Sequence, residues 1–237
     1  MIPKIIHYCW FGKNKMPDNL KKYMQSWKEY CPDYEIKCWS EDNYDVNSNS
    51  FLKAAYKAKA WAFVSDYVRL DVIYRFGGIY LDTDVELLKN LDFLLNNKAY
   101  IGIQQNGYYC TTGLGFGGEK GNTAIYKMLE KYNDLIYKEE NKEKLACPYL
   151  NDAAIREIGV IEKKDIIKFK DITIYGPKYF DPLATGNTKN LLCAETISIH
   201  HYAATWTSKS EQIKRKLILS MGEERYYKFK KFFGRVK

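Results

Sequence analysis

Residues 65–84 constrain this chain more than any other stretch. They read SDYVRLDVIYRFGGIYLDTD, which predicts a largely apolar helix, a double glycine and a short strand that ends in Asp-x-Asp. Gly77 and Gly78 predict a left-handed helix cap, because glycine adopts positive φ without steric cost. The chain is therefore expected to turn directly from helix to strand, which brings the polar residues of both elements toward one end of a sheet.

Asp82 and Asp84 are the first candidate site. Two apart on a strand, their carboxylates are expected on one face, with Ile79, Leu81 and Val85 on the other. Two hard oxygen ligands that leave coordination positions open suit Mg²⁺ or Mn²⁺ shared with a diphosphate. A metal-bound diphosphate leaving group indicates a nucleotide-sugar transferase.

Two other interpretations of this motif were weighed. Asp-x-Asp also occurs by chance, so the motif alone is a hypothesis with a false-positive risk. A calcium-binding EF-hand loop that starts at Asp82 is excluded, because Leu87 and Phe93 stand where it requires Gly and Glu.

Asp66 and Arg69 lie on the preceding helix among apolar residues. Charges in such surroundings are costly unless they are paired. Their i, i+3 spacing leaves open a plain intrahelical ion pair, which contributes only a few tenths of a kcal/mol when exposed. The other hypothesis is that both belong to the site of Asp82 and Asp84.

The same block resembles the DXD-containing glycosyltransferases of family 32. Further support comes from upstream segments, namely residues 2–10 (IPKIIHYCW), Ser26-Trp27 and Pro32-Asp33-Tyr34. This family includes fungal initiating mannosyltransferases and bacterial capsule enzymes, with the catalytic domains of clostridial glucosylating toxins as distant relatives. The resemblance is strong over residues 1–110 and weak beyond. It implies the GT-A type, Rossmann-like α/β fold of nucleotide-sugar transferases, in which the first βα unit holds the nucleotide.

The resemblance also implies roles for individual residues. Asp84 is expected to bind the metal and Asp82 to contact ribose and metal, while Asp66 and Arg69 hold the donor sugar and diphosphate. Further candidates for the sugar hydroxyls are Asn151 and Asp152, which are expected to open a helix.

Histidine and tryptophan supply the remaining candidates. In the resembling enzymes a residue five positions before a tryptophan completes the metal shell. The residue at that position here is His201, five before Trp206. Two alternatives stay open, namely that His200 is the ligand or that the histidine is purely structural. Trp206 itself counts among the donor-binding candidates. Trp10 follows the first strand and is expected to stack on the nucleotide base, unless it is a core tryptophan. His7 is expected to pack under Trp10 in a structural role.

A glycine-rich segment offers a competing motif. Residues 113–118 (GLGFGG) match the dinucleotide fingerprint G-x-G-x-x-G, but they lack a clean preceding strand and lie far from the N-terminal βαβ unit. We expect a loop near the acceptor pocket instead. A phosphate-binding P-loop is excluded, because the sequence has no Gly-x-x-x-x-Gly-Lys-Ser/Thr run.

Strand and helix signals alternate along the chain, which favours parallel pairing in a single α/β domain over residues 1–207. The expected strands are 4–8, 34–39, 99–104, 166–169 and 172–175, and the expected helices are 19–30, 51–56, 125–137 and 153–158. The sequence shows no signal peptide and no 18-residue apolar stretch. Six scattered cysteines indicate reduced thiols in a cytoplasmic protein.

Residues 208–237 form a basic tail. From Lys209 to Lys237 there are ten Lys or Arg and three Glu, a net charge of +7 within a chain whose formal charge is +8. Interleaved apolar residues predict an amphipathic helix that lies on anionic membrane at the inner face of the plasma membrane. A nucleic-acid patch and a solvated face with a packed apolar stripe are the alternatives.

Together these features predict a Mn²⁺- or Mg²⁺-dependent retaining glycosyltransferase, a hexosyltransferase. Its donor would be a nucleotide-diphosphate sugar, with UDP-sugar favoured and GDP-mannose possible, and its acceptor a bacterial surface glycan or lipid-linked oligosaccharide, with no nucleic-acid partner. Two alternatives stay open, a metal-dependent nucleotide-sugar hydrolase or phosphoryl-transfer enzyme and a non-catalytic glycan-binding module.

Overall fold

The computed structural model describes residues 1–184 and 188–203. A seven-stranded sheet has the order β2-β1-β3-β6-β5-β8-β7, and a second sheet pairs β4 with β9. The strands are β1 (Ile5–Cys9), β2 (Glu35–Trp39), β3 (Gly78–Tyr80), β4 (Val85–Leu87), β5 (Ala99–Ile103), β6 (Cys110–Gly118), β7 (Ile166–Lys168), β8 (Thr173–Tyr175) and β9 (Ser198–His200). The helices are α1 (Asp18–Tyr30), α2 (Ser50–Lys57), α3 (Trp61–Phe76), α4 (Thr123–Glu130), α5 (Cys147–Arg156) and α6 (Pro177–Phe180), with short 3₁₀ helices η1 (Asp92–Asn96) and η2 (Glu139–Leu145).

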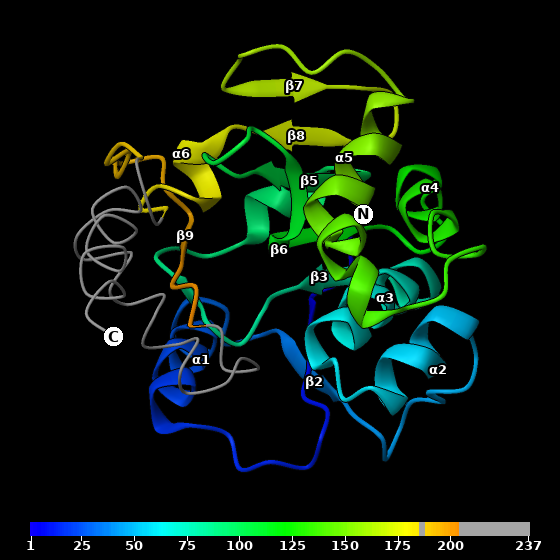
Figure 1. The fold of residues 1–237 in the computed structure, drawn as a ribbon. Coiled ribbons are helices and arrows are strands. Elements are labelled where there is room, and N and C mark those ends of the chain that lie inside the picture. The colour runs from blue at the N-terminus through cyan, green and yellow to red at the C-terminus, as the bar shows by residue number, and fades with distance from the viewer. Residues whose placement is uncertain (185–187, 204–237) are drawn as a thin grey trace, which may run out of the picture.

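Helices cover both faces of the large sheet, which confirms the predicted α/β class (Figure 1). The helices α2 to α5 pack on one face against Tyr80 and Ile101. On the other face α1, η1 and α6 pack against Ile79 and Tyr100. Adjacent residues of one strand thus enter opposite cores, as the two-residue period of a strand requires.

The sheet is mixed rather than all parallel. The strand β1 is parallel to both β2 and β3, and β5 is parallel to β8, as the alternation of strands and helices predicts. However, β6 is antiparallel to both of its neighbours, and the edge strand β7 is antiparallel to β8. The prediction of parallel pairing is therefore correct for three of the six strand pairs and wrong for those that involve β6 and β7.

The double glycine connects α3 to β3 without a loop. Gly77 has φ 72° and Gly78 has φ 109°, and the N–H of Gly77 donates to the Ile73 carbonyl at 2.8 Å. The ψ of Gly77 is −176°, so this residue has an extended, mirror-image conformation rather than the left-handed helical one that we expected. A Cβ on Gly78 would lie 2.7 Å from His7 Nε2, so the position has no room for a side chain.

Asp82 and Asp84 do not lie on a strand, contrary to our expectation. The strand β3 ends at Tyr80 and β4 begins at Val85, and the intervening residues form a turn closed by the Val85 N–H to the Asp82 carbonyl at 3.0 Å. The alternation of side chains expected on a strand therefore stops at Leu81.

The glycine-rich segment is a strand, and the prediction of a loop there is wrong. Residues 113–118 lie within β6, between β3 and β5. A Cβ on Gly117 would lie 2.8 Å from the Gly78 carbonyl oxygen and 2.8 Å from the ring of Tyr100. Glycine is needed there because the neighbouring backbone and ring approach closely, rather than for a turn.

All six cysteines are free thiols, and four of them are buried. None of the helices described in the structure is long and apolar enough to cross a membrane.

His7 is a buried structural residue that joins β1, β2 and the double glycine. Its Nδ1 accepts a hydrogen bond from Trp39 Nε1 at 3.0 Å, so Nε2 carries the proton and donates to the Gly77 carbonyl at 2.9 Å. The ring stacks on Trp39. We had expected it to pack under Trp10. Burial lowers the pKa of His7 to about 4.

We predict that His7 makes folding stability depend on pH between 7 and 5. The unfolded-state histidine takes up a proton near pH 6.5, whereas the folded one stays neutral until the pH approaches 4. Its contribution is therefore complete above pH 6.5 and falls by about 2 kcal/mol between pH 7 and pH 5. Urea unfolding of the wild type and of His7→Gln at both pH values should show a smaller loss in the variant. An equal loss in both proteins would contradict this assignment.

Candidate active site

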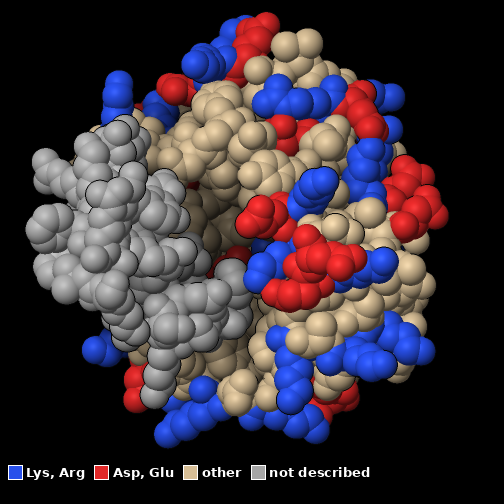
Figure 2. Space-filling view, viewed as in Figure 1, with Lys and Arg blue, Asp and Glu red and all other residues tan. Residues whose placement is uncertain are grey.

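A cavity of about 460 Å³ opens beside the Asp-x-Asp turn. Its walls come from the loop after β1, from α3, β6 and the start of α5, and from the residues at the end of β9. Figure 2 shows the hollow, with acidic atoms in its depth. The four residues predicted to be catalytic, Asp66, Arg69, Asp82 and Asp84, all line it. The fold thus brings them together, while their catalytic roles stay predictions.

Arg69 lies buried at the back of this cavity and joins α3 to the turn. Its Nη2 donates to Asp82 Oδ1 at 3.1 Å and lies 3.2 Å from Asp66 Oδ1. Its Nε donates to the Ser65 carbonyl at 3.0 Å, and its guanidinium lies over the ring of Tyr80. A surface ion pair within the helix is therefore excluded, because the Arg69 and Asp66 side chains are only 4% and 9% exposed and Arg69 also bonds outside the helix.

Burial raises the pKa of both carboxylates beside Arg69, Asp66 and Asp82. Burial raises the pKa of Asp66 to about 6, although the charge of Arg69 opposes the shift. Burial also raises the pKa of Asp82, again against the effect of Arg69. Asp82 Oδ1 accepts a second hydrogen bond from Tyr80 at 3.1 Å, whereas Oδ2 lies 3.4 Å from the point where a Cβ on Gly113 would stand. The glycine therefore leaves space above this carboxylate.

Asp82, Asp84 and His200 form a cluster whose ligand atoms lie within 4.8 Å of one another. Asp84 Oδ1 lies 3.2 Å from His200 Nε2, and Oδ2 accepts from the Ala203 N–H at 2.7 Å. Burial opposes ionisation of Asp84, but His200 and the backbone donors outweigh it and lower its pKa to about 2. Burial alone would lower the pKa of His200, but the neighbouring Asp84 raises it. The cluster is thus two carboxylates and one imidazole.

The structure places His200, not His201, next to the two carboxylates, which corrects our expectation. The Nε2 of His201 lies 2.7 Å from Glu86 Oε2, and its ring stacks on Tyr23 with the centroids 4.0 Å apart. Since β9 pairs with β4, successive residues alternate between faces, and His200 is the one directed toward Asp84. Counting back from Trp206 therefore selects the histidine that contacts Glu86 rather than the one that contacts Asp84.

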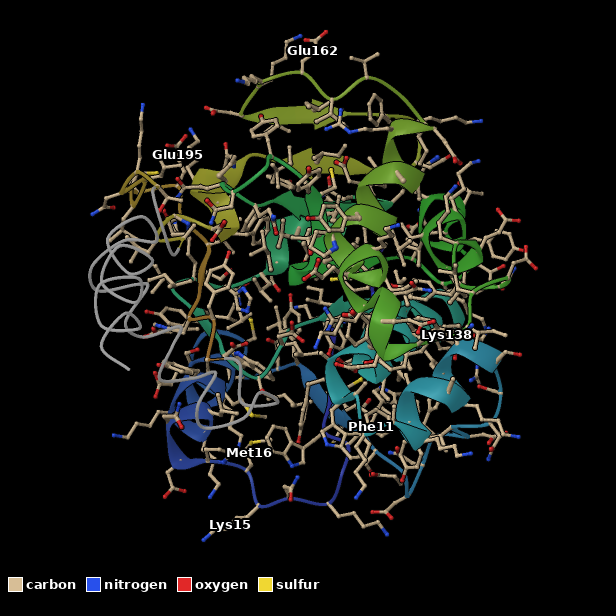
Figure 3. All side chains as sticks on the ribbon, in the orientation of Figure 1. Phe11, Lys15, Met16, Lys138, Glu162 and Glu195 are labelled. Carbon is tan, nitrogen blue, oxygen red and sulfur yellow. The ribbon has the colours of Figure 1, made fainter. Side chains whose placement is uncertain are left out.

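Three further aromatic residues line the cavity. Trp10 is partly exposed and its Nε1 donates to the Asn14 carbonyl at 2.7 Å, so the indole is fixed at the wall. Phe11 and Trp61 also line the cavity. In Figure 3 Phe11 lies at the inner end of the loop after β1 and Lys15 at its outer edge.

Asn151 and Asp152 do not line the cavity, and they lie within α5 rather than opening it. Both are buried against β6. Asn151 Oδ1 accepts from the Thr112 N–H at 3.1 Å, and Asp152 Oδ1 accepts from the Cys110 N–H at 3.1 Å. The contacts described in the structure therefore anchor α5 to the sheet, and none of them involves the cavity.

Several residues at the site were missed by sequence analysis. Tyr80 was not among the candidates, yet its hydroxyl donates to Asp82 Oδ1. Ser65 holds Arg69, and Gly113 and Cys147 line the cavity. The position of Ser65 four residues before Arg69 was an available signal, since i and i+4 meet on a helix. Trp206 and the tail, 208–237, lie outside the described residues.

Residues 17–101 match the family described as the glycosyltransferase sugar-binding region containing DXD motif. The matched segment includes α3, the double glycine and the Asp-x-Asp turn. Residues 17–101 therefore correspond to the DXD-containing sugar-binding region of glycosyltransferases.

Named relatives are also glycosyltransferases. The chain is 25% identical over 215 residues to the uncharacterized glycosyltransferase L373 of Acanthamoeba polyphaga mimivirus. That match covers 87% of this chain and 84% of the viral protein. It is 32% identical over 104 residues to inositol phosphoceramide mannosyltransferase 3 of Schizosaccharomyces pombe. That match covers 42% of this chain but only 29% of the length of the fungal enzyme.

Among solved structures, the PaToxG glycosyltransferase superposes with a TM-score of 0.50 at 20% identity, covering 66% of this chain and 68% of the other. This likeness concerns the fold alone. The fold is of the GT-A type, as the family resemblance implies.

We predict that Arg69→Lys impairs transfer. Lysine keeps the charge but lacks the planar fork that contacts Asp66 and Asp82 together. The free energy of unfolding should fall by about 2 kcal/mol, and turnover of the donor should fall about 100-fold because both carboxylates lose their fixed positions.

The matched control is Arg75→Lys, which alters an i, i+4 pair between the exposed Arg75 and the partly buried Asp71 on the same helix. This change should leave turnover intact and stability within about 0.5 kcal/mol. Donor turnover and urea unfolding of both variants give the comparison, and a fully active Arg69→Lys protein would refute the role of Arg69.

Proposed function

We propose that this glycosyltransferase moves a sugar from a nucleotide-diphosphate donor to a glycan hydroxyl with the help of a divalent metal. The observation that carries the proposal is the cluster of Asp82, Asp84 and His200 in the wall of the cavity, next to buried Arg69. A diphosphate needs several positive partners, and this cavity offers a guanidinium and a metal-binding set side by side.

The three side chains fit Mn²⁺ or Mg²⁺. Two carboxylates and one imidazole are acceptable ligands for Mn²⁺, and a set of three leaves positions for phosphate oxygens. Asp82 and Asp84 would bind through carboxylate oxygen and His200 through Nε2, the atom next to Asp84. When bound, the metal neutralises the charge of the departing diphosphate.

Arg69 and Asp66 would orient the donor. Arg69 is already fixed by Ser65, Asp66 and Asp82, so its position needs no rearrangement when the donor enters. Asp66 lines the cavity and accepts hydrogen bonds when ionised, which suits a sugar hydroxyl. The main contributions of the chain would therefore be positioning and charge stabilisation.

Aromatic residues in the cavity wall would hold the nucleotide base. Trp10, Phe11 and Trp61 give flat apolar surfaces that line the cavity. Stacking of a base on such a ring contributes about 1 to 3 kcal/mol. We favour a UDP-sugar donor, with GDP-mannose as the second choice.

Transfer with retention is the stereochemical course we propose, as the family resemblance implies. A front-face route needs no protein base. The three carboxylates that line the described cavity agree with such a route, because each already has a partner. Asp66 pairs with Arg69, and Asp84 pairs with His200. Asp82 contacts both Arg69 and Tyr80.

For the acceptor we propose a lipid-linked or surface glycan of capsule, exopolysaccharide or O-antigen type. Support comes from the names of relatives, which include the inositol phosphoceramide mannosyltransferases of Schizosaccharomyces pombe and the lactosylceramide 4-alpha-galactosyltransferase of Rattus norvegicus. Both names describe a sugar added to a lipid-borne group.

We predict that Asp84→Asn removes metal-dependent activity. The amide keeps the shape and can still accept from the Ala203 N–H, so the fold should survive. Loss of the charge should reduce Mn²⁺-dependent hydrolysis or transfer of UDP- and GDP-sugars by more than about 100-fold.

Glu86→Gln is the matched control, because Glu86 is a carboxylate two residues further on that lies outside the cavity and contacts His201. This variant should keep its activity. If Asp84→Asn folds and turns over normally, or if Glu86→Gln is the inactive one, the metal site is not where we place it. Turnover to free sugar with every glycan acceptor tested would instead favour the hydrolase hypothesis.

We also propose peripheral membrane contact through residues 208–237, on the strength of their composition alone. Each Lys or Arg near an anionic surface contributes about 1 kcal/mol, and salt weakens the attraction. Anionic lipid at the inner face of the plasma membrane would then concentrate the enzyme near a lipid-linked acceptor.

Removal of residues 220–237 should release the protein from anionic vesicles at low salt, while turnover on a soluble acceptor mimic persists. A flotation assay at low and high salt measures this. Equal flotation of the full-length and shortened chains, or of neither, would refute the membrane role of the tail.

A further inference from the structure

We infer that Asp181 and Tyr202 position His200 for metal binding, an inference that rests on the metal site proposed above. Neither residue belongs to the cluster of possible ligands. Tyr202 follows β9 and Asp181 follows α6, two segments that run side by side in Figure 1. The inference concerns how the imidazole is held, because a ligand that is free to turn binds a metal more weakly.

His200 is held in an unusual way for a metal-ligating histidine. Such a residue ordinarily donates its second ring N–H to a carboxylate or carbonyl, which fixes the plane of the ring. Here Nε2 faces Asp84, while Nδ1 is buried and has no hydrogen-bond partner within residues 1–184 and 188–203. Among the described residues, the orientation of the ring is therefore supported by packing.

Tyr202 supplies that packing. Its ring centroid lies 4.1 Å from that of His200, with the two planes inclined by 38°. Tyr202 has φ 50°, a left-handed backbone conformation that is uncommon for a large aromatic residue. This strained conformation puts the phenol ring against the imidazole, so the contact is specified rather than incidental.

Asp181 fixes the far end of Tyr202. This carboxylate is 1% exposed, and its Oδ1 accepts from the Tyr202 hydroxyl at 2.8 Å. Its Oδ2 accepts from the Gln105 N–H at 2.8 Å. A hydrogen bond to a buried charged acceptor is stronger than one between neutral groups, so the phenol has one favoured position.

The anchor is itself rigid because Gln105 clamps the chain around it. Gln105 Nε2 lies within 3.2 Å of the carbonyl oxygens of Asp181, Pro182 and Lys189, to which its two N–H groups can donate, and Oε1 accepts from the Lys189 N–H. The turn after β5 thus fixes Asp181, Asp181 fixes Tyr202, and Tyr202 fixes His200. Loss of the Tyr202 hydroxyl would leave the ring in place but free to move.

The test is the Mn²⁺ affinity of Tyr202→Phe, measured by isothermal titration calorimetry without donor. Removal of an outer partner of a metal ligand weakens binding by about 10- to 100-fold, and we expect a loss of about 10-fold here. Tyr202→Leu also removes the aromatic wall and should weaken Mn²⁺ binding further.

The matched control is Tyr44→Phe, which also removes a tyrosine hydroxyl bonded to an aspartate, Asp71, at 2.6 Å, but outside the cavity. Both Phe variants lose a similar hydrogen bond, so a purely structural role predicts similar shifts in the unfolding midpoint and unchanged Mn²⁺ affinity. A specific loss of Mn²⁺ affinity in Tyr202→Phe supports the inference. Equal Mn²⁺ affinity in Tyr202→Phe and the wild type, with the affinity lost in Asp84→Asn, overturns the positioning role and leaves the proposed function standing. A wild type that binds no Mn²⁺ overturns both.

Discussion

The site depends on one buried cation. Arg69 has almost no exposure to solvent, so its charge requires partners, and it obtains them from Asp66 on its own helix and from Asp82 beyond the double glycine. This contact fixes the turn against α3 and thereby fixes Asp84, whose carboxylate contacts His200 on a distant segment. Removing Arg69 would leave the buried carboxylate of Asp66 and the partly buried one of Asp82 close together without this cation, which costs several kcal/mol. Stability and the proposed donor binding are therefore coupled at this residue.

Glycines give the site its shape as much as charges do. Gly77 and Gly78 allow α3 to turn into β3 within one residue, so Arg69 and Asp82 are only 13 residues apart and in contact. Gly113 keeps open the space over Asp82 that a side chain would fill. Both effects arise from the missing Cβ, at one position through backbone conformation and at the other through volume.

Sequence reasoning predicted the α/β class, α3, the double-glycine turn and the four charged residues that meet in the cavity, because each has a local signal in residues 65–84. It was wrong where tertiary contacts decide. The alternation of a strand was extended through Asp82 and Asp84, although β3 ends at Tyr80 and the chain turns there. His201 was preferred over His200, but the pairing of β9 with β4 determines which histidine faces Asp84. The strand β6 was missed because its glycines serve close packing between neighbouring strands, which no local pattern encodes.

Our account makes nucleotide binding conditional on a metal held by Asp82, Asp84 and His200. The most direct measurement is calorimetric titration of the wild-type chain with UDP and with GDP, each with Mn²⁺ and with a chelator. We expect one nucleotide, UDP in preference, to bind with Mn²⁺, and binding to weaken at least ~10-fold with the chelator or in His200→Ala. Binding that is equally tight without metal, or no binding of either nucleotide, would contradict the account.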